Sequence, residues 1–215
     1  MNIVSLNAGL PRSVRSGDRD VTTGIFKSAV AGPRMLRRTN LEGDGQADLE
    51  NHGGVAKAVY AYPSEHYGFW RKELPGTELP WGMFGENLTT EGLREEDAGI
   101  GDHYRIGRAV VMVCQPRIPC YKLGVRFGRD DIAKRFLASE RCGIYFSVVE
   151  EGQVAAGDAI ERLQRGEHGL TIADIERAYV HGRDDIALVR RIVSLKIMPA
   201  GLHNDFVQKL AALES

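Results

Sequence analysis

Glycine is the feature that most restricts how this chain can fold, since 25 of its 215 residues are Gly and 8 more are Pro. These residues supply the backbone angles that tight turns need, so the chain can reverse direction often. Short apolar runs with β-branched residues lie between them, at Asn2–Leu6, Gly24–Val30 and Lys57–Tyr62. The pattern favours a strand-rich body over a helical bundle, and we expect a mainly β fold.

The same pattern continues to about residue 165. Further strands are expected at Tyr104–Ile106, Ala109–Cys114, Cys142–Val149 and Ala159–Leu163. Two helices are expected among them, at Pro63–Leu74 and Asp130–Leu137. The first of these has Pro in its first turn, where the missing N–H costs nothing.

The composition changes after this point. Gly166–Gly169 resembles a linker, and apolar residues then recur three to four apart in three segments that begin at Thr171, Asp185 and Gly201. We therefore predict a body over residues 1–165 and a three-helix extension over 166–215, which makes the chain α+β overall. A unit of roughly 45 residues is too small to be very stable alone, so we expect it to pack on the body.

Charge and cysteine content exclude several classes of protein. The 28 Lys and Arg residues nearly balance the 29 Asp and Glu residues, for a formal charge of −1, so we expect no nucleic-acid polymer as partner. No apolar run approaches the ~18–20 residues of a membrane span, and the N-terminus lacks the apolar segment of a secretory signal. Three cysteines without a CxxC pair indicate a reducing compartment, and we expect a cytoplasmic protein.

The segment Cys114–Lys122 (CQPRIPCYK) is the strongest candidate for chemistry. Its two prolines stiffen the chain after an apolar strand, so Cys120 is expected on a rigid loop. Arg117 and Lys122, if they lie close to Cys120, favour its thiolate, which is both a nucleophile and a ligand for soft metals. The alternative is that Cys120 is a buried apolar residue, which is the reading we favour for Cys114 and Cys142.

Two further segments gather Gly and polar residues. In the first, His52, Gly53 and Gly54 precede Lys57. Paired glycines and a cation suit a phosphate site, but a simple Gly-Gly turn explains the spacing as well. Neither nucleotide-binding fingerprint is present, and His52 has no zinc-site spacing. In the second segment Asn87 either holds the edge of a heterocycle or caps a turn. The aromatic residues of 60–70 are expected to form core.

Four motifs, taken together and in order, resemble the MOSC domain family, most closely its stand-alone bacterial YiiM-type branch with a C-terminal three-helix extension. They are GDGQADLENHGG with Lys57, YPSEHYGFW, FGENLTTEGL and QPRIPCYKL. The resemblance covers most of residues 1–163. One departure is Ala56, where relatives often have an acidic residue before the cation.

The resemblance implies a β-barrel with a few peripheral helices and a site for the molybdopterin form of molybdenum cofactor. The cysteine of the last motif is Cys120, which it implies to be a molybdenum ligand and the catalytic residue. The cofactor contacts would come from His52, Gly53, Gly54, Lys57, Asn87, Arg117 and Lys122. Cations and backbone N–H groups suit its phosphate, and an amide suits the pterin edge.

The activity implied is reduction of N-hydroxylated compounds, including hydroxylaminopurine base analogues, from N–OH to N–H. Electrons would come from a separate flavin or iron–sulfur reductase, because the chain has no motif for NAD(P)H or flavin. Two alternatives stay open. The chain is a carrier of molybdenum cofactor, or of a persulfide on Cys120, without turnover, or it is a cofactor-free barrel whose helices bind another protein. The physiological substrate and the oligomeric state do not follow from the sequence.

Overall fold

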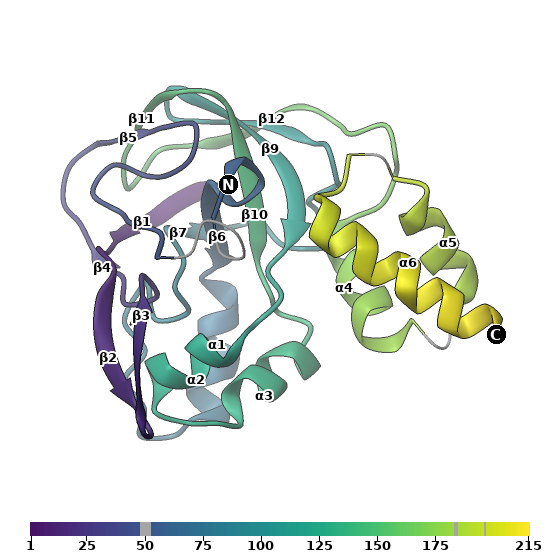
Figure 1. Cartoon of the computed structure of the whole chain (residues 1–215). Helices are drawn as coiled ribbons and strands as arrows, with labels where there is room; N and C mark the ends of the chain where they lie inside the picture. Colours follow the sequence, from purple (N-terminus) through teal and green to yellow (C-terminus); the bar gives the residue numbers. More distant parts are fainter. Residues whose placement is uncertain (48–52, 183–184, 196) are drawn as a thin grey trace.

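The computed structural model describes residues 1–47, 53–182, 185–195 and 197–215. Its body is an eight-stranded sheet in the order β12-β8-β9-β10-β6-β7-β1-β4 (Figure 1). The strands are β1 (Asn2–Ala8), β4 (Ser28–Ala29), β6 (Val59–Pro63), β7 (Leu88–Glu91), β8 (His103–Ile106), β9 (Ala109–Pro116), β10 (Ile144–Glu150) and β12 (Ile160–Gln164). Neighbours are antiparallel, except that β6 and β7 run parallel.

Two small strand pairs and a short 3-10 helix stand beside this sheet. They are the hairpin of β2 (Arg12–Ser16) and β3 (Arg19–Thr23), the pair of β5 (Arg34–Leu36) and β11 (Gly152–Val154), and the 3-10 helix η1 (Val55–Lys57). The hairpin was not expected from the sequence, because its exposed, Arg-rich strands lack an apolar run.

The first residues of β1 lie beside the chain that leads into β12. The Ile3 N–H donates to the carbonyl of Asp158 at 2.9 Å, and the Gly157 N–H donates to the carbonyl of Ile3 at 2.8 Å. Asn2 of β1 forms an isolated bridge with Ala159, the residue before β12. The Ile160 N–H also donates to the carbonyl of Met1, at 2.8 Å. Beyond these first residues of β1, no ladder joins β1 to β12 among the described residues. The closed barrel that the resemblance implied is therefore not shown, although the α+β class is.

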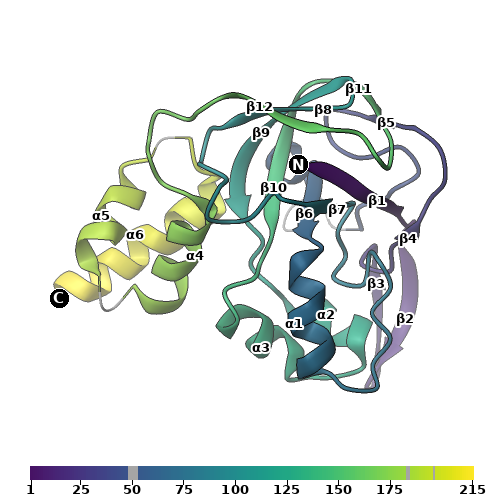
Figure 2. The same ribbon diagram turned by 180° about the vertical axis from the view of Figure 1, so that it is seen from behind.

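The described residues form six α-helices, which lie in two groups. They are α1 (Glu65–Glu73), α2 (Tyr121–Phe127), α3 (Ile132–Ala138), α4 (Ile172–His181), α5 (Ile186–Val193) and α6 (Ala200–Glu214). Both ribbon views place α1, α2 and α3 together at one end of the sheet and the last three helices at its side (Figures 1 and 2). In the described ranges, no helix has the length and apolar character that crossing a bilayer requires.

Aromatic side chains fill the space between the sheet and the first helix group. The rings of Tyr62 and Phe84 have centroids 4.7 Å apart, and Trp70 stacks on Phe136 at 5.8 Å. The Trp70 indole N–H donates to the Tyr62 hydroxyl at 2.7 Å, so the buried polar tip is satisfied. This confirms that the aromatic residues of 60–70 form core.

The C-terminal helices begin as their sequence predicts. The Thr171 hydroxyl accepts from the backbone N–H of Asp174 at 3.2 Å, and the Asp174 carboxylate accepts from the Thr171 N–H at 3.0 Å. This reciprocal capping box fixes the start of α4. The Ile172 N–H also bonds the carbonyl of Ala98 in the body, at 2.9 Å. The helices thus pack on the body as expected, and the domain boundary at residue 165 stays a prediction.

Two expected strands are shorter than their apolar runs. Within Gly24–Val30 only the two residues of β4 are strand, and the run expected from Lys57 begins at Val59. Before Val59 the chain forms the 3-10 helix η1, and at Gly24 the backbone packs closely against another loop. The Cβ of an alanine at position 24 would lie 2.3 Å from the carbonyl oxygen of Gly45.

Candidate functional site

Cys120 lies where the chain leaves the central strand β9 and enters α2. Pro116 ends the strand, and Cys120 is the residue before the first helical turn, with extended backbone angles. Its carbonyl accepts from the Leu123 N–H at 3.0 Å, which closes that turn. Cys120 is half-buried, whereas Cys114 and Cys142 are buried, and burial raises the pKa of both of those thiols. The expectation that those two cysteines are core is confirmed.

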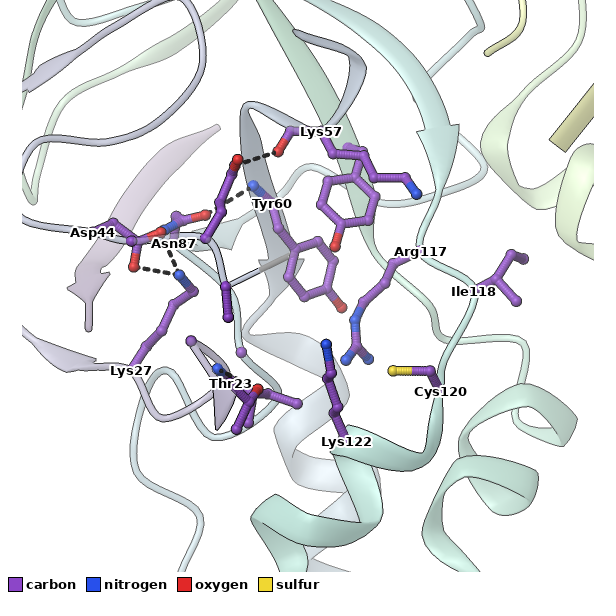
Figure 3. A pocket seen from close by; sticks show the side chains of 17 residues that line it. Thr23, Lys27, Asp44, Lys57, Tyr60, Asn87, Arg117, Ile118, Cys120 and Lys122 are labelled. Atoms are coloured by element: carbon purple, nitrogen blue, oxygen red, sulfur yellow. Dashed lines mark hydrogen bonds and ion pairs between the residues drawn. The ribbon is translucent and has the colours of Figure 1, made fainter. Parts of the chain in front are cut away.

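A pocket opens beside Cys120, and side chains from widely separated segments line it (Figure 3). It brings together five of the residues that the sequence predicted, namely Lys57, Asn87, Arg117, Cys120 and Lys122. The rest of the lining is Thr23, Gly24, Ile25, Lys27, Asp44, Gly45, Gln46, Ala47, Tyr60, Gly85, Ile118 and Tyr145. A thiol and several cations thus share one cavity.

Arg117 is the most buried cation of this cavity, with 7% of its surface exposed. Its guanidinium lies 5.3 Å from the ring centroids of both Tyr60 and Phe136. Burial lowers the pKa of Arg117, but the neighbouring Tyr60, Tyr145 and Cys120 more than offset this, and its pKa lies above the usual value. The buried Nη1 atom has no hydrogen-bond partner among the described residues. A buried donor without a partner costs about 1–3 kcal/mol, so this atom favours an anionic or accepting ligand.

Two lysines enter the same pocket from different elements. Lys57 ends the 3-10 helix η1, and Lys122 comes from the first turn of α2, where it is 9% exposed. In Figure 3 the Lys122 amine and the Cys120 sulfur both point towards the Arg117 guanidinium. The cations expected around Cys120 are therefore present, and they favour its thiolate.

The paired glycines of the first motif do not line the pocket. Gly54 has φ 86° and precedes η1, and its carbonyl accepts from the Lys57 N–H at 3.0 Å. Gly53 and Gly54 therefore act as the turn that places Lys57, and their direct contact with a cofactor stays a prediction. His52 lies outside the described residues.

Asn87 lines the pocket, but its amide is used inside the protein. Its Nδ2 donates to Asp44 at 2.9 Å and to the carbonyl of Asn7 at 3.4 Å. Its Oδ1 accepts from the backbone N–H of Tyr60 at 3.2 Å. Because both amide hydrogens have protein acceptors, Asn87 orients Asp44 and joins β1 to β6 and β7. A direct bond from Asn87 to a heterocycle stays a prediction.

The sequence did not indicate an ion pair in the pocket wall between Lys27 and Asp44. Both side chains are almost fully buried, and both carboxylate oxygens of Asp44 accept from the Lys27 amine. Burial lowers the pKa of Lys27, and the attraction of Asp44 opposes that shift. A further bond from the Gly9 N–H to Asp44, at 3.0 Å, ties this wall to the end of β1.

A second buried carboxyl group lies behind this wall. Glu86 accepts from the Tyr67 hydroxyl, from the Gly82 N–H at 2.8 Å and from the Thr89 hydroxyl at 2.9 Å. Burial raises the pKa of Glu86, and these bonds oppose the shift. The network holds the turn that presents Gly85 to the pocket. Glu86 therefore has a structural role, which is to hold the turn of the FGENLTTEGL motif.

Of the two residues of this ion pair, Asp44 could have been found from the sequence. Asp44 stands between Gly43 and Gly45, and a carboxylate between two glycines suggests close packing of backbone around it. The Cβ of an alanine at position 45 would lie 2.3 Å from the ring of Pro11, so only Gly fits. Lys27 had no such signal, because it is a single charge in an apolar run.

Known proteins resemble this chain over much of its length. The sequence matches the MOSC domain family over residues 48–161. It is 41% identical over 208 residues to the uncharacterized protein YflK of Bacillus subtilis, covering 97% of this chain and 94% of that one. A protein named reductase from Gibberella moniliformis is 34% identical over 161 residues, which cover 74% of this chain and 28% of that protein.

A solved structure extends the likeness to the whole fold. The crystal structure of YiiM from Geobacillus stearothermophilus superposes with a TM-score of 0.81 at 36% identity, covering 97% of this chain and 98% of that chain. The likeness includes the C-terminal helices, since so little of either chain is left out. The chain therefore belongs to the MOSC domain family and is of the YiiM type.

Proposed function

We propose that this protein is a cytoplasmic molybdenum-cofactor-dependent reductase that converts N-hydroxylated compounds, such as hydroxylaminopurine base analogues, to the corresponding N–H compounds. The observation that supports this most directly is the position of Cys120, a half-buried thiol that shares one pocket with Arg117, Lys57 and Lys122. The MOSC domain family is associated with molybdenum cofactor. The fungal relative named reductase supports redox chemistry, although this chain spans only 28% of that protein.

The residues of the pocket fit such a cofactor. Molybdenum favours soft sulfur ligands, and Cys120 is the only cysteine among the lining residues. The unpartnered Nη1 of Arg117 offers a buried donor to an anionic group. Lys57 and Lys122 add point charges that suit a phosphate.

The bound cofactor would supply the two-electron chemistry of the reaction. The overall conversion takes up two electrons and two protons, breaks the N–O bond, and yields an N–H group and water. Within the chain, Cys120 would hold the metal and Arg117 would orient the cofactor. Lys122, beside Cys120, would hold a proton for the departing oxygen. The electrons would come from a separate flavin or iron–sulfur reductase.

The test is turnover by cofactor-loaded protein. Protein purified without oxygen from a host that makes molybdenum cofactor should reduce hydroxylaminopurine with reduced viologen as the electron donor. Cys120→Ala should abolish the activity. Cys114→Ala, which removes a buried thiol outside the pocket, should keep it. Equal rates for Cys120→Ala and wild type would contradict the proposal.

A further inference from the structure

Arg126 extends the row of cations out of the pocket along α2. It lies four residues after Lys122, so both side chains lie on one face of the helix. Its Nη2 donates to the carbonyl of Lys27, another lining residue, at 3.4 Å. Its Nε is buried and has no hydrogen-bond partner among the described residues. Arg126 thus stands next to the pocket with part of its donor capacity unused.

Arg12 approaches the same place from the β2–β3 hairpin. It is paired across the hairpin with Thr23, and paired residues of antiparallel strands present their side chains on the same face. Thr23 lines the pocket, so Arg12 lies directly across the hairpin from a residue of the pocket wall. The preceding residue, Pro11, packs against Gly45, which also lines the pocket.

The two guanidinium groups share one aromatic ring. The Arg12 guanidinium lies 3.9 Å from the ring centroid of Phe26, and that of Arg126 lies 5.1 Å from it. Phe26 sits between the lining residues Ile25 and Lys27. Burial first, and then the charge of Arg12, lowers the pKa of Arg126. Two like charges thus lie together beside residues of the pocket wall.

No carboxylate neutralises this pair within the described parts of the chain. Neither Arg12 nor Arg126 forms an ion pair there, whereas Arg15 of the same hairpin lies 3.7 Å from Asp20. Glu86 contributes attraction to Arg126 only from a distance, and burial raises the pKa of that carboxyl group. An anion at this place would relieve the repulsion between the two guanidinium groups. Two arginines also provide the forked donors that phosphate prefers.

We propose that Arg12 and Arg126, brought together on the Phe26 ring, bind the phosphate group of the substrate, so that this protein prefers N-hydroxylated nucleotides to the free bases. This inference rests on the proposed function. Cys120 and Thr23 line the same pocket, so a nucleotide would place its base towards Cys120 and its phosphate towards the two arginines. The cofactor phosphate would use the separate donors Arg117, Lys57 and Lys122.

The test compares hydroxylaminopurine riboside with its 5′-monophosphate on cofactor-loaded protein, by calorimetric binding and by kcat/KM. The wild type should favour the monophosphate by about tenfold or more, because one charge-assisted contact to the phosphate contributes about 1.4 kcal/mol. Arg126→Gln and Arg12→Gln should each reduce this preference to about threefold or less, with binding of the riboside unchanged. Arg15→Gln is the matched control on the same hairpin and should keep the full preference.

Each contrary result has a separate meaning. Equal binding of riboside and monophosphate by the wild type would overturn the inference. The inference would also be overturned if Arg12→Gln and Arg126→Gln both contained less molybdenum but kept the preference for the monophosphate. The two arginines would then hold the cofactor phosphate. If nothing is reduced but the binding preference and its loss in the variants persist, the phosphate subsite stands and the proposed reductase activity fails.

Discussion

At the scale of single residues, the surroundings of the three cysteines decide which of them can react. Cys120 is half-buried beside cations, whereas burial raises the pKa of the Cys114 and Cys142 thiols. We expect iodoacetamide at pH 7 to label Cys120 alone in protein purified without cofactor. Arg117→Gln should slow labelling by roughly three- to tenfold, because about 1 kcal/mol of attraction to the thiolate is lost. Mass spectrometry over time measures the rate.

The control for this experiment is Arg141→Gln. Arg141 lies 4.1 Å from the ring centroid of Phe69 and does not line the pocket of Cys120, so its loss should leave the labelling rate unchanged. Lys122→Gln provides a second substitution in the pocket, and it should also slow labelling. Unchanged rates in both pocket variants would show that these cations do not activate Cys120.

The buried pair of Lys27 and Asp44 makes a prediction about stability. Lys27→Met would leave the Asp44 carboxylate buried without its cation, and the loss of one partner of a buried pair costs about 3–5 kcal/mol. Urea unfolding should therefore show a decrease of that size in the free energy of unfolding. Lys72→Met on the exposed side of α1 is the control and should change it by under about 0.5 kcal/mol. A loss no larger than that of the control would mean that Asp44 is protonated or hydrated.

The residues of the site differ in how far the sequence could predict them. Cys120, Arg117 and Lys122 stand within six residues of one another, so local chain stiffness was enough to bring them together. Lys27 and Asp44 meet only because three loops pack closely around Gly24 and Gly45. Such packing depends on the whole fold and cannot be predicted from a single sequence.

At the scale of secondary-structure elements, helix α4 carries a buried carboxyl group against the body. Glu176 is fully buried, and neither of its oxygens has a hydrogen-bond partner among the described residues. Burial raises the pKa of Glu176 to about 8; the neighbouring Cys142 opposes this shift, and Glu95 and Glu140 add to it. The folded protein thus holds a proton on Glu176 at neutral pH, which the unfolded chain releases.

This proton makes stability depend on pH in a defined direction. Between the unfolded pKa, near 4.5, and the folded value of about 8, the folded state binds one more proton, so stability falls as the pH rises. The slope contributed is at most about 1.4 kcal/mol per pH unit. Glu176→Gln should remove this contribution, so the variant should lose less stability than the wild type between pH 6 and pH 9 in urea unfolding.

A surface glutamate provides the control for that comparison. Glu161, whose side chain is 68% exposed on β12, should leave the pH dependence unchanged when replaced by Gln. An equal loss of stability for wild type and Glu176→Gln across this range would show that Glu176 does not carry the proton.

The elements that the sequence predicted well are those that short-range sequence patterns determine. The capping box of Thr171 and Asp174 fixed the start of α4, and regular apolar spacing predicted α5 and α6. The 3-10 helix η1 replaced the expected first residues of β6, because alternation of residue type does not distinguish a short helical turn from a strand end.

At the scale of the whole molecule, one hydrophobic core joins the sheet to the C-terminal helices. Buried side chains from β9, α4 and α5, such as Val113, Ile175 and Val189, belong to a single cluster. Backbone bonds cross between the parts as well, since the Ile100 N–H donates to the carbonyl of Leu170 at 2.8 Å. The extension is therefore expected to unfold together with the body.

Two spectroscopic signals test this. The two tryptophans, Trp70 and Trp81, lie in the body, whereas α4, α5 and α6 hold more than half of the residues in the described α-helices. Urea unfolding followed by tryptophan fluorescence and by circular dichroism at 222 nm should give coincident midpoints, as a two-state transition requires. Separate midpoints would show that the extension folds as its own unit.

The order of the strands is the part of the fold that the sequence did not predict. β6 lies between β10 and β7, and this arrangement depends on pairing between segments far apart in the chain. The resemblance to the MOSC domain family supplied the overall class, whereas the closed barrel it implied is not shown by the described ladders. The hydrogen bonds of Asn87 and Asp44 likewise needed the three-dimensional structure.

The proposed role of Cys120 as a molybdenum ligand is tested by the metal content of the purified protein. Wild-type protein, Cys120→Ala and Cys114→Ala should be purified without oxygen from the same cofactor-producing host, and molybdenum per chain measured by mass spectrometry. We expect about one molybdenum per chain for the wild type and Cys114→Ala. Cys120→Ala should show a marked loss, because Cys120 is the only cysteine among the lining residues. Equal molybdenum in all three proteins, or none in any after reconstitution with cofactor, would contradict this role.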